Sequence, residues 1–598
     1  MRKIVIVGGV AGGATAAARL RRLSERYRIV LFERGEHISF ANCGLPYYIG
    51  GVIRDRNRLL LQTASGMSKR FRIDLRMLTE VTAIHRERKT VSAKDLRTGE
   101  EYEESYDTLI LSPGARPILP PIEGMDQAKA SFALRTIPDA DRIKAYVERE
   151  KPTSAAIIGG GFVGLEMAEN LVERGVKVSL VEMADQVLPP LDYEMAAMVH
   201  AYLKECGVRL HLEDGLKALE KGGRRLVLHS GKTLEADMII LAVGVQPENE
   251  LARKAGLELG VRGAIRVNPR LQTSDPDIYA IGDAVEVKDY VHGFATHVPL
   301  GWPANRQGRL VADIIHGFDV HYAGTLGTAI VKLFGLTVAT TGNNEKTLKR
   351  LGIPHEAVHV FPSSHAAYYP NASPLALKLI FDRETGRIFG AQAVGEEGVD
   401  KRIDVIATAI KGGLTVRDLP DLELAYAPPF SSAKDPVNIA GYAATNILDR
   451  LVEVLQWNEL DDHLASGGIL LDVRTPREVE GGGIDGAVHL PLDELRDRLG
   501  ELPKDKTIGV MCAVGLRGYL ASRILMENGF RVKNLDGGYR LYSYAKGPRS
   551  WRKMMPIQTN MPTVSRNWKK RGRSRAASFF ICPFFFPFPS MDCHGLQK

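Results

Sequence analysis

Short apolar runs, each closed by glycine, proline or an acidic residue, recur through the first half of the chain. Runs of this length, followed by turn residues and helical stretches, predict buried strands of a parallel sheet. They lie at residues 3–7, 29–33, 106–111, 155–158, 176–182, 238–243 and 278–281. The alternation of strands with helices predicts an α/β fold.

Two of these runs lead into a glycine-rich turn and then a helix. The first turn is 8–13, and the strand after its helix ends at Glu33; the second turn is 159–164, and the corresponding strand ends at Glu182. Such a turn places a pyrophosphate on a helix N-terminus, while the acidic residue binds ribose hydroxyls. Val10 occupies the middle glycine position of the first turn. Because the unit occurs twice, the chain is expected to bind two dinucleotides.

Length and charge limit the remaining possibilities. A chain of 598 residues is about four times the ~150 residues of a typical domain, so several domains are expected. The net charge is +8, but residues 546–598 hold eleven basic residues and one acidic residue, which is +10 and leaves 8 − 10 = −2 for residues 1–545. A nearly neutral body predicts no nucleic-acid partner.

Targeting and cysteine signals favour a cytoplasmic protein. No apolar run reaches the ~18 residues needed to cross a bilayer, and the opening residues lack the apolar core of a signal peptide. No membrane partner is therefore expected. Five scattered cysteines are too few for a disulfide framework, which favours a reducing compartment. Cys206 is interpreted as structural, and no cysteine or histidine cluster has metal-ligand spacing, so no metal is predicted.

The order of first turn, second turn and then Gly282-Asp283, which is expected to precede a helix, resembles the two-dinucleotide flavoprotein disulfide reductases. The resemblance implies that the first unit and Asp283 hold FAD and that the second unit holds NAD(P)H. A carboxylate at 182 repels a 2′-phosphate, so NADH is favoured, although Arg174 and Lys177 leave NADPH open. The implied cofactor-binding residues are Gly8, Gly9, Val10, Ala11, Gly13, Glu33, Gly114 and Asp283 for FAD, and Gly159, Gly161, Gly164 and Glu182 for the nicotinamide dinucleotide.

The segment 39–47 contains a single cysteine, Cys43, where typical disulfide reductases carry two. A site with one thiol completes its redox cycle with an external sulfur or as a sulfenic acid. The segment resembles the coenzyme A-disulfide reductases and their relatives, the NADH oxidases and peroxidases. Those oxygen- and peroxide-reducing relatives carry a histidine where this chain has Ala11, which favours the coenzyme A branch. That branch implies coenzyme A as bound substrate or as a mixed disulfide on Cys43, with substrate-binding residues Thr15, Arg19, Arg22, Ser39, Asn42, Asn305 and Lys434.

Further segments resemble the interface and C-terminal motifs of the same branch, at 304–308, 324–328, 364–370 and 425–434. The resemblance implies a homodimer in which Tyr368 and Tyr426 of the neighbouring subunit approach the reactive sulfur. A tyrosine hydroxyl can protonate a leaving sulfur; simple interface packing is the alternative role. Trp302 stands where relatives carry a small residue.

A second candidate centre follows residue 446. Residues 451–460 are expected to open a new helix. Strands are expected at 469–474 and 508–511, an amphipathic helix at 491–502 and a further helix at 519–528. Cys512 ends the last strand and opens the loop 512–517, whose backbone N–H groups can hold an anionic persulfide. This arrangement resembles rhodanese domains, with Cys512 as sulfur carrier and Gly515 and Arg517 in its loop. Gly482-Gly483-Ile484 stands where relatives often read Gly-His-Ile.

The expected architecture is two Rossmann-like dinucleotide-binding domains, an α+β dimerisation domain and a C-terminal α/β rhodanese domain. The predicted boundaries are 1–115 and 245–323 for FAD, 116–244 for NAD(P)H, 324–446 for dimerisation, 455–545 for rhodanese, and 546–598 for a basic, Phe/Pro-rich, disordered tail. The leading hypothesis is NAD(P)H-dependent reduction of coenzyme A disulfide, persulfide or polysulfide, coupled to sulfane-sulfur transfer on Cys512. The alternatives are an NADH oxidase or peroxidase, and a sulfur-carrier or redox-sensing module.

Overall fold

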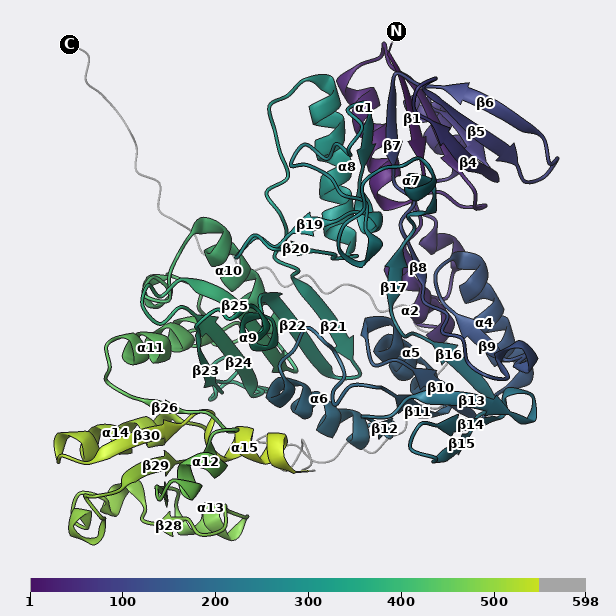
Figure 1. The fold of residues 1–598 in the computed structure, drawn as a ribbon. Coiled ribbons are helices and arrows are strands. Elements are labelled where there is room, and N and C mark those ends of the chain that lie inside the picture. The colour runs from purple at the N-terminus through teal and green to yellow at the C-terminus, as the bar shows by residue number, and fades with distance from the viewer. Residues whose placement is uncertain (1, 548–598) are drawn as a thin grey trace, which may run out of the picture. The chain divides into compact units, whose positions relative to one another are not determined.

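The computed structural model describes residues 2–547. Its first part is a five-stranded parallel sheet of order β18-β7-β1-β2-β3 (Figure 1). The strands are β1 Lys3–Val7, β2 Arg28–Glu33, β3 Asp74–Met77, β7 Thr108–Leu111 and β18 Ile278–Ala280. On one face Ile4 and Ile6 pack against α1 (Ala11–Leu23) and α8 (Gly301–His316). On the other, Val5 and Val7 pack against an antiparallel sheet of β4 (Thr79–His85), β5 (Thr90–Asp95) and β6 (Glu101–Ser105).

The second part repeats this arrangement. Its sheet has the order β12-β11-β10-β16-β9, and every pairing in it is parallel. The alternation is the same as in the first part, because Ala155 and Ile157 face one core and Ala156 and Ile158 face another. The elements are α4 Ile137–Glu150, α5 Phe162–Glu173, α6 Tyr193–Glu205, β9 Ser131–Ala133, β10 Ser154–Ile158, β11 Lys177–Val181, β12 Arg209–His211 and β16 Met238–Leu241, with the antiparallel strands β13 Leu216–Glu220, β14 Arg225–Leu228 and β15 Thr233–Glu235 beside them.

A paired ribbon of β8 (Ala115–Pro117) and β17 (Val245–Pro247) marks the places where the chain enters and leaves the second part. Shorter elements between the larger ones are α2 Leu45–Gly50, α3 Ala64–Phe71, α7 Glu250–Lys254, β19 Val287–Lys288 and β20 Ala295–Thr296.

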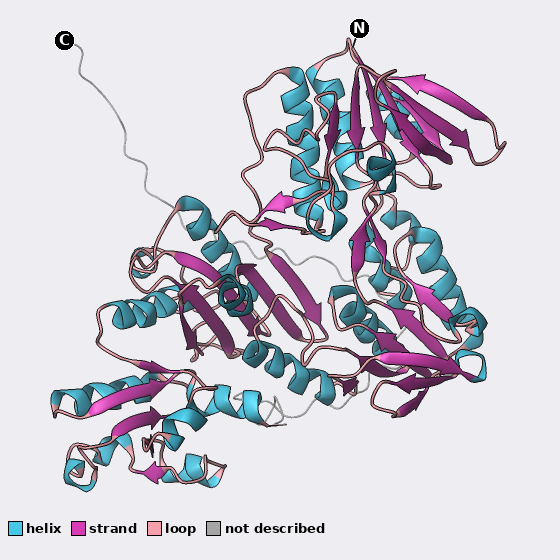
Figure 2. Ribbon diagram, in the orientation of Figure 1, coloured by secondary structure: helices cyan, strands magenta, loops and turns pink. Residues whose placement is uncertain are grey.

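The third part is an antiparallel sheet of order β21-β22-β25-β24-β23 that is flanked by helices (Figure 2). All seven residues of β24 and all eight of β25 are buried, and the two strands are apolar except for Lys378 and Gln392. The elements are β21 Ala329–Leu333, β22 Leu336–Gly342, β23 Glu356–Val360, β24 Leu375–Phe381, β25 Ile388–Gly395, α9 Glu345–Leu351, α10 Val399–Gly412 and α11 Pro436–Leu448.

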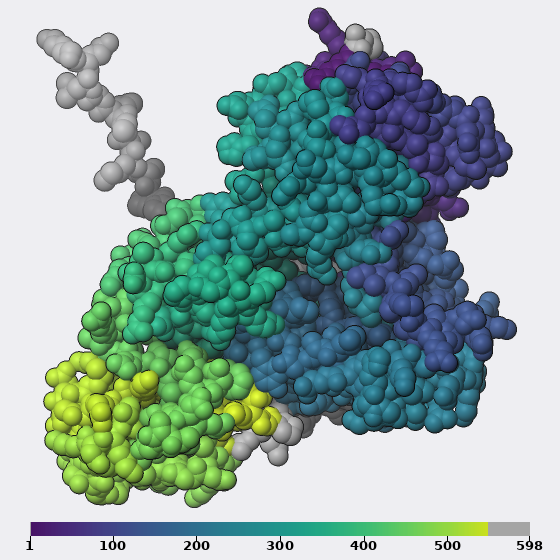
Figure 3. Space-filling model, in the orientation of Figure 1, coloured from purple at the N-terminus to yellow at the C-terminus, as the bar shows by residue number. Residues whose placement is uncertain are grey.

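The last part is a five-stranded parallel sheet of order β26-β30-β29-β27-β28. In the space-filling view this yellow-green segment lies against the green antiparallel part (Figure 3). The elements are β26 Val454–Leu455, β27 Ile469–Asp472, β28 Val488–His489, β29 Thr507–Met511, β30 Arg531–Leu535, α12 Leu460–Ala465, α13 Pro476–Glu480, α14 Leu516–Glu527 and α15 Gly538–Lys546. The fold class expected from the sequence is confirmed: two Rossmann-like units, an α+β unit and a C-terminal α/β unit.

Three predicted helices are wrong. After Gly282 and Asp283 the chain makes one 3₁₀ turn, Gly282–Ala284, and then turns extended because Val285 bridges to Ile265. Residues 451–460 hold the edge strand β26, whose Leu455 pairs with Leu535, and the helix α12 begins only at Leu460. Instead of the helix predicted at 491–502, the chain forms two 3₁₀ turns, Leu492–Glu494 and Leu499–Glu501. An apolar i, i+3 repeat places side chains on one side of a 3₁₀ turn as well as on one side of a helix.

No helix within residues 2–547 has the length and hydropathy to cross a bilayer. The predicted tail lies outside the described residues except for 546 and 547, and Lys546 is the last residue of α15, where its ammonium pairs with Asp461.

Candidate functional site

Both glycine-rich turns have the backbone geometry that a dinucleotide requires. Gly8 has φ +99°, and a Cβ there would lie 2.1 Å from the carbonyl oxygen of Ser112; Gly159 has φ +111°, and its Cβ would lie 2.3 Å from the carbonyl oxygen of Ala242. Only glycine fits both positions. At Gly161, the counterpart of Val10, a Cβ would meet no described protein atom within 4 Å.

The acidic residue of each unit is hydrogen-bonded to its own glycine turn. The Glu33 carboxylate accepts the backbone N–H of Gly9 at 2.8 Å and that of Gly35 at 2.7 Å. The Glu182 carboxylate accepts the N–H of Gly160 at 2.7 Å and that of Ala184 at 2.9 Å. The two acids therefore have equivalent positions in the two units, as their positions in the sequence suggested.

A cavity of about 650 Å³ opens beside the first turn. Its lining includes eight predicted cofactor or substrate residues: Gly8, Gly9, Val10, Ala11, Glu33, Asn42, Gly114 and Asp283. Burial raises the pKa of Asp283 to about 6, with Arg135 opposing the shift. A half-buried carboxylate that lines the cavity suits the hydroxyl donors of a ribityl chain, so the residues present fit FAD. Gly13 is not part of this lining; a Cβ there would lie 1.9 Å from the carbonyl oxygen of Gly8, so its role is close helix–strand packing.

Cys43 lies in the 3₁₀ turn Asn42–Gly44, directly before α2. Its side chain is exposed, and neighbouring Asn42 lines the cavity. Partial desolvation, followed by the negative charges of Glu166 and Asp283, raises the pKa of the Cys43 thiol. The thiol is therefore accessible to an external sulfur compound, and acidic neighbours surround it.

Glu166 comes from α5, the helix that follows the second glycine turn. Helix α2 packs against α5, which brings the Tyr47 hydroxyl to 3.4 Å from Glu166 Oε1. Burial raises the pKa of Glu166 to about 7. A carboxyl from the nicotinamide unit thus lies near the thiol of the flavin unit. Sequence reasoning missed it, although its place one turn into this helix was a usable signal.

Four of the predicted substrate residues, Thr15, Arg19, Arg22 and Asn305, lie on α1 and α8; Ser39 and Asn42 precede α2, and Lys434 precedes α11. Thr15 Oγ1 donates a hydrogen bond to Asn305 Oδ1 at 2.8 Å, which joins the two helices. Arg19 is paired with Asp313 at 2.7 Å, so its charge is partly neutralised. Ser39 has φ +49° and lies next to the first turn, its N–H bonded to the Gly9 carbonyl. Arg22 and Lys434 are exposed.

Tyr368 and Tyr426 meet, although 58 residues separate them. Their hydroxyl oxygens lie 3.0 Å apart, and the side chains are exposed, with 77% and 48% of their surface accessible. Trp302 is also exposed, at the start of α8. An exposed hydrogen-bonded tyrosine pair has the polar tips and apolar rings typical of interfaces.

The second candidate centre surrounds Cys512. The side chain is buried, and the backbone N–H of Gly515 donates to its Sγ at 3.1 Å. A backbone hydrogen bond also fixes the start of the loop: the N–H of Tyr539, on α15, donates to the Cys512 carbonyl at 2.8 Å. Arg517 bonds through both Nη atoms to the Glu478 carboxylate, at 2.8 and 2.6 Å. The structure therefore brings Cys512, Gly515 and Arg517 together, and adds Glu478, which the sequence did not identify.

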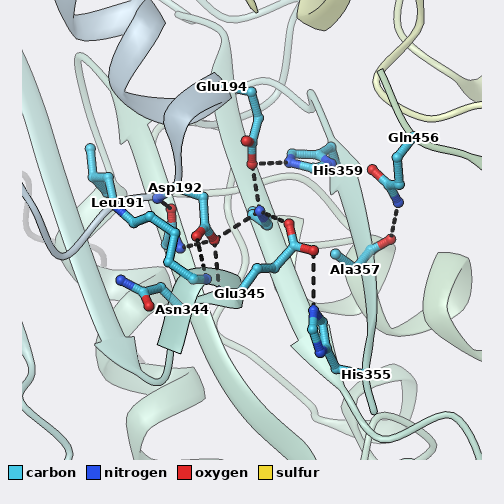
Figure 4. Close-up of polar contacts among 12 residues, drawn as sticks. Leu191, Asp192, Glu194, Asn344, Glu345, His355, Ala357, His359 and Gln456 are labelled. Carbon is cyan, nitrogen blue, oxygen red and sulfur yellow. Dashed lines mark hydrogen bonds and ion pairs between the residues drawn. The ribbon is translucent and has the colours of Figure 1, made fainter. Parts of the chain in front are cut away.

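A buried ionic cluster lies where three parts of the chain meet (Figure 4). Asp192, Glu194 and Glu345 offer oxygens within 4.8 Å of one another, but the Lys378 ammonium bonds to all three. Lysine thus supplies the positive charge that a metal would supply. Next to it, the His359 ring bonds to Asp536 at 2.6 Å and to Glu194 at 3.2 Å, so the cluster continues into the last part of the chain.

Two dinucleotide units, an exposed thiol beside the first of them and a thiol loop in the last part define a flavin- and pyridine-nucleotide-dependent sulfur oxidoreductase. Family comparison gives the same result. Residues 2–307 match the pyridine nucleotide-disulphide oxidoreductases, 328–436 match their dimerisation domain, and 456–545 match the rhodanese-like domain. The chain belongs to the pyridine nucleotide-disulphide oxidoreductase family and carries a C-terminal rhodanese domain. The family implies FAD and NAD(P)H as cofactors.

Individual relatives share most of this organisation. The coenzyme A disulfide reductase of Staphylococcus aureus strain JH9 is 40% identical over 446 residues, which is 74% of this chain and 100% of the relative. The crystal structure of reduced Bacillus anthracis CoADR-RHD superposes with a TM-score of 0.90 at 62% identity, covering 91% of this chain and 98% of that one. An NAD-dependent persulfide reductase from A. fulgidus has a TM-score of 0.84 at 40% identity, covering 90% and 100%.

Proposed function

We propose that this enzyme uses NADH, through FAD, to reduce a sulfur–sulfur bond that links coenzyme A to a second sulfur, with Cys43 as the exchanging thiol. The observation that carries the proposal is that the exposed Cys43 directly follows Asn42, which lines the cavity of the first dinucleotide unit, and lies close enough to Asp283 for that carboxylate to raise its pKa. Within residues 2–547 neither Cys206 nor Cys512 forms a disulfide with it. Since no other described cysteine pairs with it, we propose that Cys43 forms its disulfide with a substrate sulfur.

The sulfur chemistry balances with coenzyme A as that partner. A Cys43–S–S–CoA disulfide takes up two electrons and one proton and gives the Cys43 thiolate and coenzyme A thiol. FAD, when bound, supplies those electrons from NADH. The thiolate then attacks the coenzyme A-bound sulfur of CoA–S–SH, which restores the mixed disulfide and releases HS⁻. With coenzyme A disulfide the same attack releases a second coenzyme A thiolate.

Residues around Cys43 are suited to the proton movements of this cycle. Glu166, with a pKa near neutrality, is able to accept or release a proton close to the thiol. Tyr368 and Tyr426, contributed by the second subunit of a homodimer, protonate the leaving sulfur. The dimerisation domain supports that assembly. Thr15, Arg19, Arg22, Ser39, Asn42, Asn305 and Lys434 are proposed to bind coenzyme A, the exposed cations through its phosphates.

NADH is proposed over NADPH because neither nearby cation reaches the position of the ribose. Arg174 donates to the carbonyl of Ile49 at 3.0 Å, at the end of α2. Lys177 begins β11, whereas Glu182 follows its end, about 16 Å away along an extended strand. No cation of this pair is therefore placed to compensate the repulsion between Glu182 and a 2′-phosphate.

Cys512 is proposed to carry sulfane sulfur for the same pathway. The backbone N–H of Gly515 in its loop donates to the sulfur, and the rhodanese domain and the reductase domains belong to one chain. Cys512 persulfide would deliver sulfur to coenzyme A and so form the substrate of Cys43.

Steady-state kinetics and mass spectrometry test this proposal. NADH consumption is measured with coenzyme A persulfide, coenzyme A disulfide, polysulfide, oxygen and hydrogen peroxide, and the purified protein is searched for coenzyme A on Cys43. Cys43→Ser is expected to abolish sulfur-dependent turnover, while Cys206→Ser retains it. Full turnover by Cys43→Ser would refute the role of Cys43. Faster turnover with oxygen or peroxide would favour an oxidase, and slow turnover with every acceptor would favour a redox-sensing module.

A further inference from the structure

The loop around Cys512 has no unpaired charge. Between residues 512 and 517 the one charged side chain is that of Arg517, and both of its terminal nitrogens bond to Glu478. The pKa of Glu478 is lowered to about 2, mainly by the hydrogen bonds from Arg517. The carboxylate is therefore ionised at neutral pH. The cation of the loop is therefore neutralised by its partner.

The charged pair beneath the loop is also balanced. Arg474 bonds to both oxygens of Asp472, and the two side chains are buried. The Arg474 guanidinium also lies 4.2 Å from the ring centre of Tyr539. Neither member of this pair offers a free charge to a ligand above the loop.

The exposed side chains at the start of α14, next to the loop, are apolar. Leu516 and Leu520 are one turn apart on the same face of α14, with 68% and 46% of their surface accessible. Ala513 and Val514 are partly exposed. Backbone N–H groups at the start of α14, which has no capping side chain and no acidic residue in its first turn, remain to hold the sulfur itself. The site thus combines a polar sulfur pocket with an apolar approach.

We propose that Glu478 determines specificity here: by neutralising Arg517, it makes Cys512 accept sulfane sulfur from alkyl persulfides and disfavour thiosulfate. This inference depends on the proposed role of Cys512 as a sulfane-sulfur carrier. An alkyl persulfide, R–S–SH, releases a thiolate whose carbon chain suits Leu516 and Leu520. Thiosulfate releases the sulfite dianion, which needs an unpaired cation near the reacting sulfur.

Both reactions balance without an added oxidant or reductant. With the persulfide, the Cys512 thiolate attacks the terminal sulfur, the donor S–S bond breaks, and Cys–S⁻ plus R–S–SH becomes Cys–S–S⁻ plus R–SH. With thiosulfate, Cys–S⁻ plus ⁻S–SO₃⁻ becomes Cys–S–S⁻ plus SO₃²⁻. The two reactions give the same Cys512 persulfide and differ in the charge of the leaving group.

The test is a single-turnover assay on the full-length protein. The Cys512 peptide is followed by mass spectrometry after exposure to glutathione persulfide or to thiosulfate, and the ratio of the two rates is recorded. Glu478→Gln frees Arg517 and is expected to raise the thiosulfate rate about tenfold relative to the persulfide rate. The matched control is Glu480→Gln, which removes an exposed carboxylate from the same helix and is expected to leave the ratio unchanged.

A second variant covers the case in which Glu478→Gln does not fold, since Glu478 also caps α13. Ala513→Arg adds an unpaired cation to the loop while keeping the Arg517–Glu478 pair, and it is expected to shift the ratio in the same direction. Equal wild-type rates with both donors, or an unchanged ratio in both variants, would overturn the inference while leaving Cys512 as a carrier. Absence of any Cys512 persulfide with either donor would refute the proposed carrier role, and this inference with it.

Discussion

His359 Nδ1 lies 2.6 Å from Asp536 Oδ2. This contact joins strand β23 of the dimerisation domain to the residue that follows β30, the last strand of the rhodanese domain. The backbone N–H of His359 bonds to the same carboxylate at 3.1 Å. Glu194, from the nicotinamide domain, accepts from the other ring nitrogen. One imidazole therefore fastens three parts of the chain to one another.

The stability of this junction is expected to depend on pH. Burial alone would lower the pKa of His359, but Asp536 and then Glu194 raise it to about 9 from an ordinary 6.5. Since the folded-state pKa is the higher one, the stabilisation is complete below about pH 6.5 and is lost as pH rises through 9, with a magnitude of up to about 3 kcal/mol. Urea denaturation followed at pH 6 and at pH 9 measures it.

The variant His359→Asn is expected to be less stable at pH 6 and to lose most of this pH dependence. The exposed His321 provides the control, because His321→Asn removes a histidine outside the cluster. An undiminished pH dependence in His359→Asn would assign the effect to other groups.

Glu166 is expected to hold the Cys43 thiol in its protonated form. Desolvation is the largest cause of the raised pKa of that thiol, and the negative charge of Glu166 is the second. Glu166→Gln should therefore move the midpoint of Cys43 alkylation by iodoacetamide to lower pH, by about half a unit or more. Glu173→Gln, which alters an exposed carboxylate on the same helix, should not move it. Identical profiles for Glu166→Gln and wild type would exclude this electrostatic influence.

The tyrosine pair is expected to act as a unit. The hydrogen bond to Tyr426 raises the pKa of Tyr368, which keeps the hydroxyl protonated and able to donate. Tyr368→Phe and Tyr426→Phe should each lower kcat with the sulfur substrate about a hundredfold, and the double variant should be no worse than the singles. Stopped-flow reduction of the flavin by NADH should be unchanged. If the single losses instead multiply in the double variant, the hydroxyls contribute independently.

Glu182 is expected to set the choice of nicotinamide dinucleotide. Replacing it with Ser removes the charge that faces a 2′-phosphate and should raise kcat/KM for NADPH relative to NADH about tenfold. Arg174→Ala is the informative comparison: since Arg174 bonds to the Ile49 carbonyl, its loss should leave the ratio unchanged. A fall in NADPH use by Arg174→Ala would show that this guanidinium reaches the phosphate after all.

The features predicted correctly from sequence are those that depend on local geometry. A left-handed glycine at a strand end and an acid at the next strand end follow from backbone constraints, and Gly8, Glu33, Gly159 and Glu182 lie where that reasoning placed them. The Cys512 loop is local too, because strand, loop and helix are consecutive.

The features that were missed depend on packing between distant segments. Glu166 lies near Cys43 because α2 packs against α5. Glu478 on α13 reaches the Cys512 loop through Arg517, its partner, which is 39 residues away in the sequence. The failed helix at 451–460 has the same origin, since Leu455 gains a strand partner in Leu535 that no local pattern announces.

The carboxylates of Glu33 and Glu182 are each clamped by two backbone amides, and this has a thermodynamic consequence. Their rotamer freedom is already lost on folding, so the ribose binding expected of these two residues would carry little further ordering cost. Because of this preorganisation, we expect the apoprotein to rebind FAD without a large rearrangement of the glycine-rich turn.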